Sequence, residues 1–309
     1  MNNSPVTGTI APVPASRQGK PSLLVGASYS FLILLFLASL LLPLILPHAA
    51  NETSANQFSA PSASYWFGTD AHGRDLLSRT LIGTRVSLVV ALVGGAITLL
   101  IGVSWGVISG YAGGKVDAVM MRTVDILYTL PSIILVLILI TTAESLVKRA
   151  LTPTQYGSLG TVIHFCLLLL GVGIVSWLTM ARIIRGQVLG LRSRSYVEAA
   201  SVMGASRWRI LRVHILPNIR NLVVTYFILS LPGIVLTESF LSYLGLGIQP
   251  PQASLGSLMS EGALQINPIQ IYWWLLVFPG TILVFSLLSL TFAGEHLKER
   301  FDPMRNKSI

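Results

Sequence analysis

Few residues in this chain have the types and spacing that chemistry requires. Asp70, His72 and Asp75 lie close together in the sequence and offer oxygen and nitrogen atoms to a metal ion. Three ligands without a fourth make an incomplete site, so we expect no bound metal. We predict instead that Asp70 or Asp75 caps the helix that follows, because an aspartate oxygen accepts the free N–H groups of a first helical turn.

Residues 109–116, Ser-Gly-Tyr-Ala-Gly-Gly-Lys-Val, come near to a phosphate-binding loop. That motif requires Gly where Ser109 stands and Ser or Thr where Val116 stands, and it follows a strand. The sequence has no other nucleotide-binding motif, no nucleophile elbow and no zinc-protease motif. We therefore predict that this chain is not an enzyme.

The composition indicates that lipid surrounds most of the chain. Of 309 residues, 52% are hydrophobic and 11% are charged, against about 25% charged in soluble domains. The mean hydropathy is +0.71. These values exclude a soluble globular protein, a disordered chain and a collagen-like fibre. The single cysteine, Cys166, excludes a disulfide within the chain.

Six apolar stretches between charged residues are long enough to cross a bilayer as helices, which takes about 20 residues each. The first follows a polar tail and is longer than a signal peptide's apolar run, so we interpret it as a retained anchor. The tail, 1–22, is predicted to be disordered because it has little apolar surface. The predicted spans are 23–46, 86–114, 122–144, 159–181, 220–246 and 272–293.

The positive charges predict the orientation, because cytoplasmic loops carry an excess of Lys and Arg. With the N-terminus inside, 16 of the 21 Lys and Arg residues fall on the inner side. Both termini are therefore expected in the cytoplasm. The predicted domains are the cytoplasmic tail 1–22, the first span with its outer segment and an amphipathic helix over 23–84, the five-span core 85–296, and the tail 297–309.

Small residues recur at every fourth position of the second span and predict a groove that another helix can approach closely. The groove faces either a moving partner helix or a static neighbour within the subunit. Prolines in the third, fifth and sixth spans each remove one helical hydrogen bond and are either hinges or harmless breaks. The small residues are Gly94, Thr98, Gly102, Gly106, Gly110 and Gly114, and the prolines are Pro131, Pro232 and Pro279.

Two acids fall within predicted spans. Asp125 follows Arg122 by three residues, a spacing that predicts a local ion pair on one helix face. Glu238 lies toward the outer part of the fifth span, where an acid is a candidate for the transport pathway. A structural hydrogen bond is an equally good interpretation of Glu238.

The segment 182–220 contains eight arginines and the pattern of two short helices. A helix is predicted from Ser195, with Gly204 at the position just after its end. Ser206 is suited to cap a second helix, in which Trp208, Leu211 and Ile215 share one face.

Pro217 is predicted to end this second helix, since the residue before a proline is pushed out of the helical region. A basic helix-turn-helix suggests DNA, but six membrane spans disfavour that. Anionic lipid headgroups would also attract these arginines. A docking site for a cytoplasmic protein accounts for the geometry as well as for the charge.

With its Glu198-Ala199-Ala200 motif and the Gly204-Ala205 pair after it, this segment resembles the EAA loop of ABC-importer permeases. Glu198-Ala199-Ala200 is followed by Gly204-Ala205 and then by His214-Ile-Leu-Pro217-Asn218, with matching spacing and position between the fourth and fifth spans. The resemblance implies a coupling helix that sits in a cleft of a cytoplasmic ATPase subunit. Its implied contact residues are Glu198, Ala199, Ala200, Gly204 and Ala205, flanked by Arg207 and Arg209.

Three further blocks narrow the resemblance to the second permease of dipeptide, oligopeptide and nickel importers. They are 67–88, which begins Phe-Gly-Thr-Asp, 240–251, which contains Phe-Leu-Ser-Tyr-Leu-Gly-Leu-Gly, and 297–303, Leu-Lys-Glu-Arg-Phe-Asp-Pro. The resemblance covers about residues 20–305. Leu255 is a departure, because this group often has Trp there.

The resemblance implies an all-α integral membrane protein with the type I ABC-importer permease fold in a bacterial inner membrane. Its partners would be a homologous permease, two ATPase subunits that bind ATP and Mg, and an extracytoplasmic peptide-binding protein. The implied function is peptide import by alternating access. Alternatives are import of nickel, another metal complex or glutathione by the same machine, and, more distantly, a secondary transporter driven by an ion gradient.

Overall fold

The computed structural model describes residues 23–249, 251–266 and 270–301. That part of the chain is helical, and its single β-type pairing is an isolated bridge between Thr69 and Asp75. This confirms the predicted all-α fold. In chain order the elements are α1 (Leu23–Ile45), α2 (Leu76–Ala112), α3 (Gly114–Tyr128), α4 (Ser132–Ala150), α5 (Pro153–Arg192), α6 (Ser195–Val202), α7 (Arg207–Ile210), the π-helical turn η1 (Leu211–Ile215), α8 (Leu216–Tyr243), α9 (Leu255–Ala263) and α10 (Trp274–Phe301).

The predicted tails are only partly within this description. Residues 1–22 and 302–309 lie outside the described residues. Helix α10 continues to Phe301, so the start of the tail predicted from 297 is helical.

Five helices are each long and apolar enough to cross a membrane. If α3 and α4 together form one bent span, the number of spans is six. The predicted third span, 122–144, is broken at Pro131, where the axes of α3 and α4 differ by 93°. Pro131 lies at the break with an extended backbone (φ −57°, ψ 123°). It lacks an N–H and keeps the residue before it out of the helical region. Pro232 and Pro279, by contrast, lie inside the continuous helices α8 and α10.

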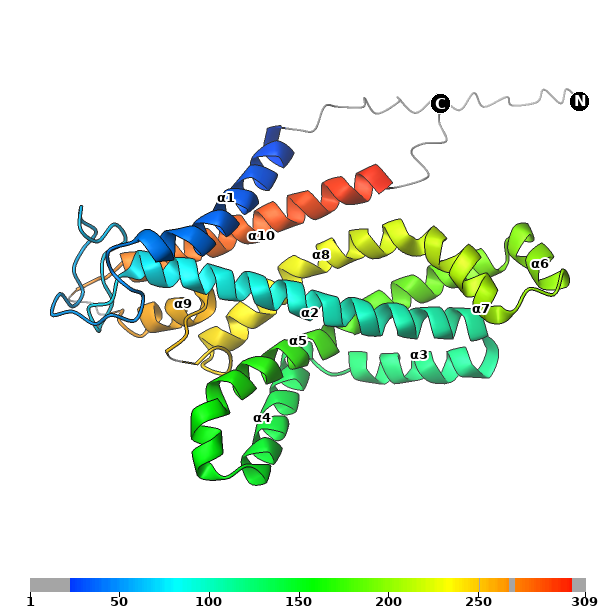
Figure 1. Ribbon diagram of the computed structural model, residues 1–309, viewed down its shortest axis with the longest axis horizontal. Helices are drawn as coiled ribbons and strands as arrows, with labels where there is room; N and C mark the ends of the chain where they lie inside the picture. The colour runs from blue at the N-terminus through cyan, green and yellow to red at the C-terminus, as the bar shows by residue number, and fades with distance from the viewer. Residues whose placement is uncertain (1–22, 250, 267–269, 302–309) are drawn as a thin grey trace, which may run out of the picture.

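The molecule is elongated, with different elements at its two ends (Figure 1). The chain between α1 and α2 lies at one end together with α9, and α6 and α7 form the opposite end. Helices α2 and α8 run between the two ends (Figure 1). Movement at one end therefore has two long helices through which it can reach the other.

The groove of small residues on α2 is filled by α5. A side-chain carbon on Gly102 would lie 2.6 Å from Met180, and one on Gly106 would lie 2.6 Å from the carbonyl oxygen of Ala181. Backbones can approach this closely only where one helix lacks side chains. Of the two interpretations of the groove, packing within the subunit is therefore the one that this structure supports.

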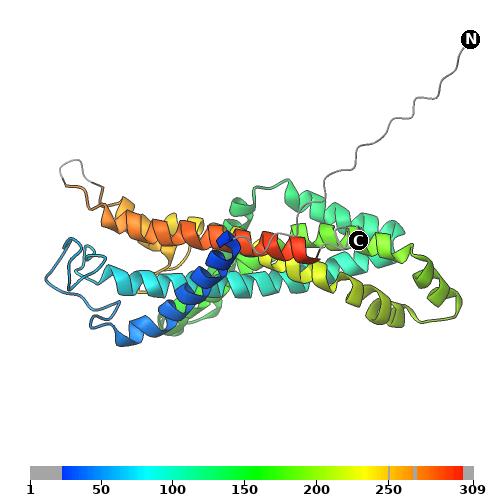
Figure 2. The ribbon, with the colours of Figure 1, turned by 90° about the horizontal axis from the view of Figure 1, so that it is seen from above.

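The first and last described helices lie side by side in both views (Figures 1 and 2). The Tyr29 hydroxyl on α1 donates to the carbonyl oxygen of Ala293 on α10 at 3.2 Å. The rings of Phe31 and Phe285 lie 6.0 Å apart. The main apolar core lies where α2, α4, α5, α8 and α10 meet, and it includes Val90, Val136, Leu168, Ile234 and Leu283.

Candidate functional site

The tip formed by α6 and α7, residues 195–210, contains the residues implied as ATPase contacts. Helix α6 ends where Gly204 adopts a left-handed backbone with φ +84°. The Gly204 N–H donates to the Ser201 carbonyl and the Ala205 N–H to the Ala200 carbonyl, each at 3.0 Å. These two bonds make a Schellman motif, which favours glycine at this position. The predicted helix and its glycine terminus are confirmed.

Helix α7 is capped as predicted, because the Ser206 side chain accepts the Arg209 N–H at 3.3 Å. Its end was predicted wrongly. The chain passes from α7 through η1 into α8 without a break, and Pro217 lies in the first turn of α8. The proline is tolerated here, where the π-helical turn passes into α8.

The predicted shared face of the second helix does not form. Ile215 is fully buried, whereas Trp208 is 67% exposed. The π-helical turn over 211–215 changes the register between them, because a π-turn has more residues than an α-turn. Ile210 is buried instead of Trp208. It packs with Val197 of α6 and Ile184 of α5 in a small apolar cluster that supports the tip.

The outer surface of the tip is exposed and partly apolar. Glu198, Ala199 and Gly204 are exposed, as are Arg207 and Arg209. Ala205 is half-buried, and Ala200 is buried against this chain, which assigns Ala200 to internal packing. Beside these predicted contacts lie two residues that the sequence analysis missed, Val202 and Met203, which are 89% and 80% exposed.

Asp125 is paired, but not with Arg122 as predicted. Its carboxylate accepts a hydrogen bond of 2.7 Å from Arg182 on α5. The guanidinium of Arg182 also lies over the ring of Tyr128, 3.9 Å from its centre. The pairing is across two helices because α3 packs on α5, which the spacing within α3 alone does not reveal.

Glu238 is fully buried where α2, α8 and the chain before α9 meet. Its carboxylate accepts hydrogen bonds from Ser87 on α2 at 2.8 Å and from Ser242 on α8 at 2.7 Å. A buried carboxylate with such partners fits the structural interpretation better than an exposed wall of a pathway. The assignment of Glu238 to the pathway stays a prediction.

The residues first considered as metal ligands have other roles. Asp75 caps α2, because its carboxylate accepts the Ser78 N–H at 2.9 Å, which confirms the predicted cap. Asp70 forms ion pairs with Arg79 at 2.5 Å and Arg74 at 2.7 Å. Arg79 also reaches Glu261 on α9 at 2.5 Å. This four-residue network ties the chain before α2 to α9 beside a cavity of about 320 Å³.

The geometry of the tip can be compared with known proteins. Residues 102–306 match the family described as binding-protein-dependent transport system inner membrane component. The chain belongs to this family. As an inner membrane component of such a transport system it is a multi-pass transport subunit and not an enzyme, as predicted.

Two permease proteins and one solved structure can be aligned with most of this inner membrane component. The oligopeptide transport system permease protein OppC of Haemophilus influenzae is 41% identical over 264 residues, 84% of this chain and 78% of that protein. The dipeptide transport system permease protein DppC of Bacillus subtilis is 36% identical over 290 residues, 94% of this chain and 84% of that one. A chain of the MetNI methionine ABC transporter, solved in inward-facing conformations, has the same fold, with a TM-score of 0.54 at 18% identity over 71% of this chain and 94% of that one.

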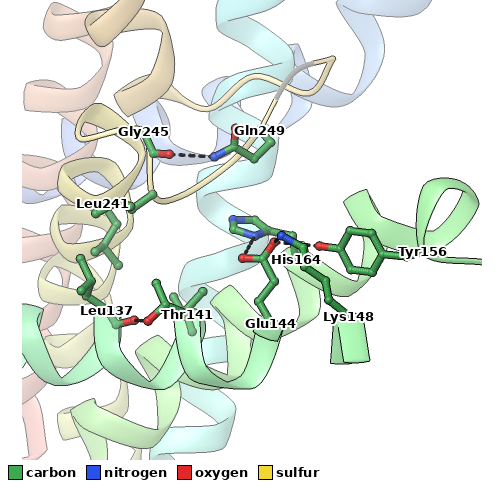
Figure 3. A pocket seen from close by; sticks show the side chains of 11 residues that line it. Leu137, Thr141, Glu144, Lys148, Tyr156, His164, Leu241, Gly245 and Gln249 are labelled. Atoms are coloured by element: carbon green, nitrogen blue, oxygen red, sulfur yellow. Dashed lines mark hydrogen bonds and ion pairs between the residues drawn. The ribbon is translucent and has the colours of Figure 1, made fainter. Parts of the chain in front are cut away.

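This inner membrane component has a second cavity, of about 360 Å³, that the sequence analysis did not find (Figure 3). Glu144 on α4 accepts hydrogen bonds from Lys148 at 2.8 Å and from the Tyr156 hydroxyl at 2.7 Å. His164 on α5 lies 3.5 Å from Glu144 and 2.7 Å from the carbonyl oxygen of Gly247. The four-residue spacing of Glu144 and Lys148 was a signal for the ion pair, but the partners on α5 and after α8 depend on the fold.

Proposed function

We propose that this chain is the second of two homologous permease subunits in an ABC importer of di- or oligopeptides. The peptide cargo is supported by the names of the relatives in Haemophilus influenzae and Bacillus subtilis. The two permeases form one pathway between them. Two ATPase subunits supply the energy and bind ATP and Mg, and one of them docks on this chain.

The exposed tip carries this proposal. Val202, Met203 and Trp208 are large exposed apolar side chains of the tip, and α6 and α7 of the tip lie at one end of the molecule (Figure 1). Exposed apolar groups surrounded by charged ones are typical of a protein contact. The Schellman turn at Gly204 and the cluster beneath it hold the tip in one shape. A preformed tip of this kind suits insertion into a cleft of the ATPase, because little ordering entropy is lost on binding.

The charges assign the two ends to the two sides of the membrane. The segment 182–220, which includes the tip, has eight arginines, whereas 247–271, which includes α9, has no Lys or Arg. The tip is therefore cytoplasmic and α9 is outside, with both termini in the cytoplasm of a bacterial cell. The α9 end then faces the extracytoplasmic binding protein that delivers peptide.

The tip passes on the movement of the ATPases. When the ATPases close on ATP, the tip moves with its cleft, and α5 and α8 move with the tip because both continue directly from it. The pathway alternates between inward-open and outward-open states whose populations depend on the nucleotide bound by the partners. Hydrolysis returns the assembly to the inward-open state.

Site-directed crosslinking tests the docking. With Cys166, the only cysteine, changed by Cys166→Ser, Met203→Cys places one reactive thiol on the tip. Leu264→Cys is the matched control, because Leu264 is also 80% exposed but lies at the α9 end. We expect Met203→Cys to crosslink to an ATPase in native membranes and Leu264→Cys not to. A chain that crosslinks to no ATPase and purifies alone would favour the secondary transporter.

Uptake by the purified and reconstituted transporter tests the cargo. Labelled di- and oligopeptides should accumulate in vesicles only with ATP, the ATPases and the binding protein present. Excess nickel or glutathione should leave this uptake unchanged. If nickel or glutathione competes with the labelled peptides, that compound is the cargo in place of peptide. The proposed docking of the ATPase would not be affected by this result.

A further inference from the structure

Asp117, the aspartate in the first turn of α3, connects three helices at the cytoplasmic end. Its two carboxylate oxygens accept a pair of hydrogen bonds from Arg185 on α5, each of 2.6 Å. The Ser109 hydroxyl on α2 donates to the same carboxylate at 2.5 Å. The paired geometry fixes both distance and orientation, because the planar guanidinium matches a carboxylate. One side chain of α3 therefore bonds to both α2 and α5.

A second ion pair joins α3 to α5 and provides a natural comparison. Asp125 and Arg182 are joined by one hydrogen bond, and their side chains are 55% and 44% exposed. The side chains of Asp117 and Arg185 are 11% and 35% exposed. An exposed pair is screened by water and contributes little, whereas a sheltered carboxylate that loses its partner is costly. The Asp117–Arg185 pair is thus the rigid connection of the two.

The turn between α2 and α3 lies against the same part of α5. Gly113 and Gly114 both have positive φ, +65° and +55°, and reverse the chain direction within two residues. Arg192 at the end of α5 donates to the Ala112 carbonyl oxygen at 3.3 Å, and a side chain on Gly113 would meet this arginine at 2.5 Å. The start of α3 is therefore fixed to the last turns of α5, which lead through two residues into α6 of the tip.

We propose that Asp117 and Arg185 are positioning residues of the transport cycle, which carry the movement of the tip from α5 to α3. This inference rests on the proposed docking of an ATPase at the tip. When α5 moves, α3 moves with it, since separation would break both bonds of the pair and leave the carboxylate with only Ser109. Helix α4 follows through the 93° bend at Pro131. The tip thereby controls the broken third span as well as the two helices continuous with it.

The test uses the complete transporter in vesicles and two matched substitutions on one helix. Arg185→Lys keeps the positive charge but loses the paired geometry, and Arg182→Lys makes the same chemical change three residues away in the exposed pair. We expect Arg185→Lys to lower the amount of peptide transported per ATP hydrolysed by about threefold or more, with ATPase recovery unchanged. Arg182→Lys should leave both quantities at the wild-type level.

Asp117→Asn is the stronger variant and should lower transport per ATP by about tenfold. Equal transport per ATP for Arg185→Lys and Arg182→Lys would overturn the inference. So would a loss of transport that only follows the loss of assembled complex. A wild-type chain that retains no ATPase would instead refute the proposed function. The two failures are distinguishable, because ATPase recovery is measured in the same preparations.

Discussion

The hydroxyl of Ser87 on α2 donates a hydrogen bond of 2.8 Å to the carboxylate of Glu238 on α8, at a point where Glu238 has no exposed surface. Ser242 donates to the other carboxylate oxygen at 2.7 Å and accepts the Ile248 N–H at 3.0 Å. One carboxylate therefore joins α2 and α8 to the chain that follows α8. This part of the molecule is held by polar contacts between buried side chains.

Removal of this carboxylate should destabilise the fold. Glu238→Ala leaves the hydroxyls of Ser87 and Ser242 buried without their acceptor, and we expect a loss of about 2–3 kcal/mol in the free energy of unfolding. Glu238→Gln keeps one acceptor oxygen and should lose less. Thermal unfolding in detergent measures both, with Thr237→Ala as a control one residue away, because the half-buried Thr237 bonds only to the Gly233 carbonyl of its own helix in the contacts described. If Glu238→Gln abolishes uptake at an unchanged Tm, the residue belongs to the pathway.

The contact of α2 with α5 should tolerate no added methyl group. Gly106→Ala would place its Cβ 2.6 Å from the Ala181 carbonyl oxygen and 2.8 Å from Ile184, so we expect a loss of about 1–3 kcal/mol. Gly186→Ala, on α5, meets nothing within 4 Å and should be neutral or stabilising by up to about 1 kcal/mol. The measurement is the free energy of unfolding of the two variants under the same conditions. Equal values would contradict the close packing of α2 on α5.

The apolar part of the tip should govern ATPase affinity. Val202→Ser together with Met203→Ser removes two exposed apolar side chains without changing the charge, and we expect recovery of the ATPase to fall by about tenfold or more. Leu264→Ser at the opposite end is the control. Unchanged recovery would mean that the surface is not the docking site.

The predicted ATPase contacts have a separate test. Glu198→Lys with Gly204→Asp reverses a charge and forces a side chain into a backbone of φ +84°, which L residues rarely adopt. We expect transport to be abolished and ATPase recovery to be weakened, while insertion into the membrane is retained. Uptake at the wild-type rate would refute the assignment of this loop.

The network at the α9 end should make stability depend on acid. Burial alone would raise the pKa of the Asp70 carboxyl, but the Arg74 N–H and the charge of Arg79 outweigh it and hold the pKa below its ordinary value. A lowered folded-state pKa stabilises the fold above the unfolded pKa of about 3.9 and loses this effect as the pH falls through the folded-state value.

We therefore expect Asp70→Asn to be less stable than the wild type at neutral pH. The Tm values of the two proteins should converge as the pH falls below about 4. Glu52→Gln, which changes an exposed acid of the same segment, should track the wild type at every pH. A constant Tm difference between Asp70→Asn and the wild type down to the lowest pH would show that the charge of Asp70 is not what matters.

Local features were predictable from the sequence because neighbours determine them. Gly204 and Ser206 each satisfy backbone groups within a few residues, so their roles could be placed without a fold. Pro131, Pro232 and Pro279 are chemically alike, yet one breaks its span and two do not, since packing decides whether a helix continues past the lost bond.

Long-range pairs could not be predicted in the same way. Asp125 has Arg122 nearby in sequence, but the packing of α3 on α5 brings it to Arg182. Val202 and Met203 look like core residues in a sequence, and only the fold leaves them 89% and 80% exposed.

The pairing of α1 with α10 has a consequence for how the chain is made. Tyr29 and its partner Ala293 are 264 residues apart, so at about 5–20 residues per second the ribosome adds the second only roughly 13–50 s after the first. Helix α1 packs against α2 and α10. During that interval only α2 of these two helices has been synthesised. A chain that stops before α10 leaves the Tyr29 hydroxyl without its Ala293 acceptor and leaves one side of α1 uncovered.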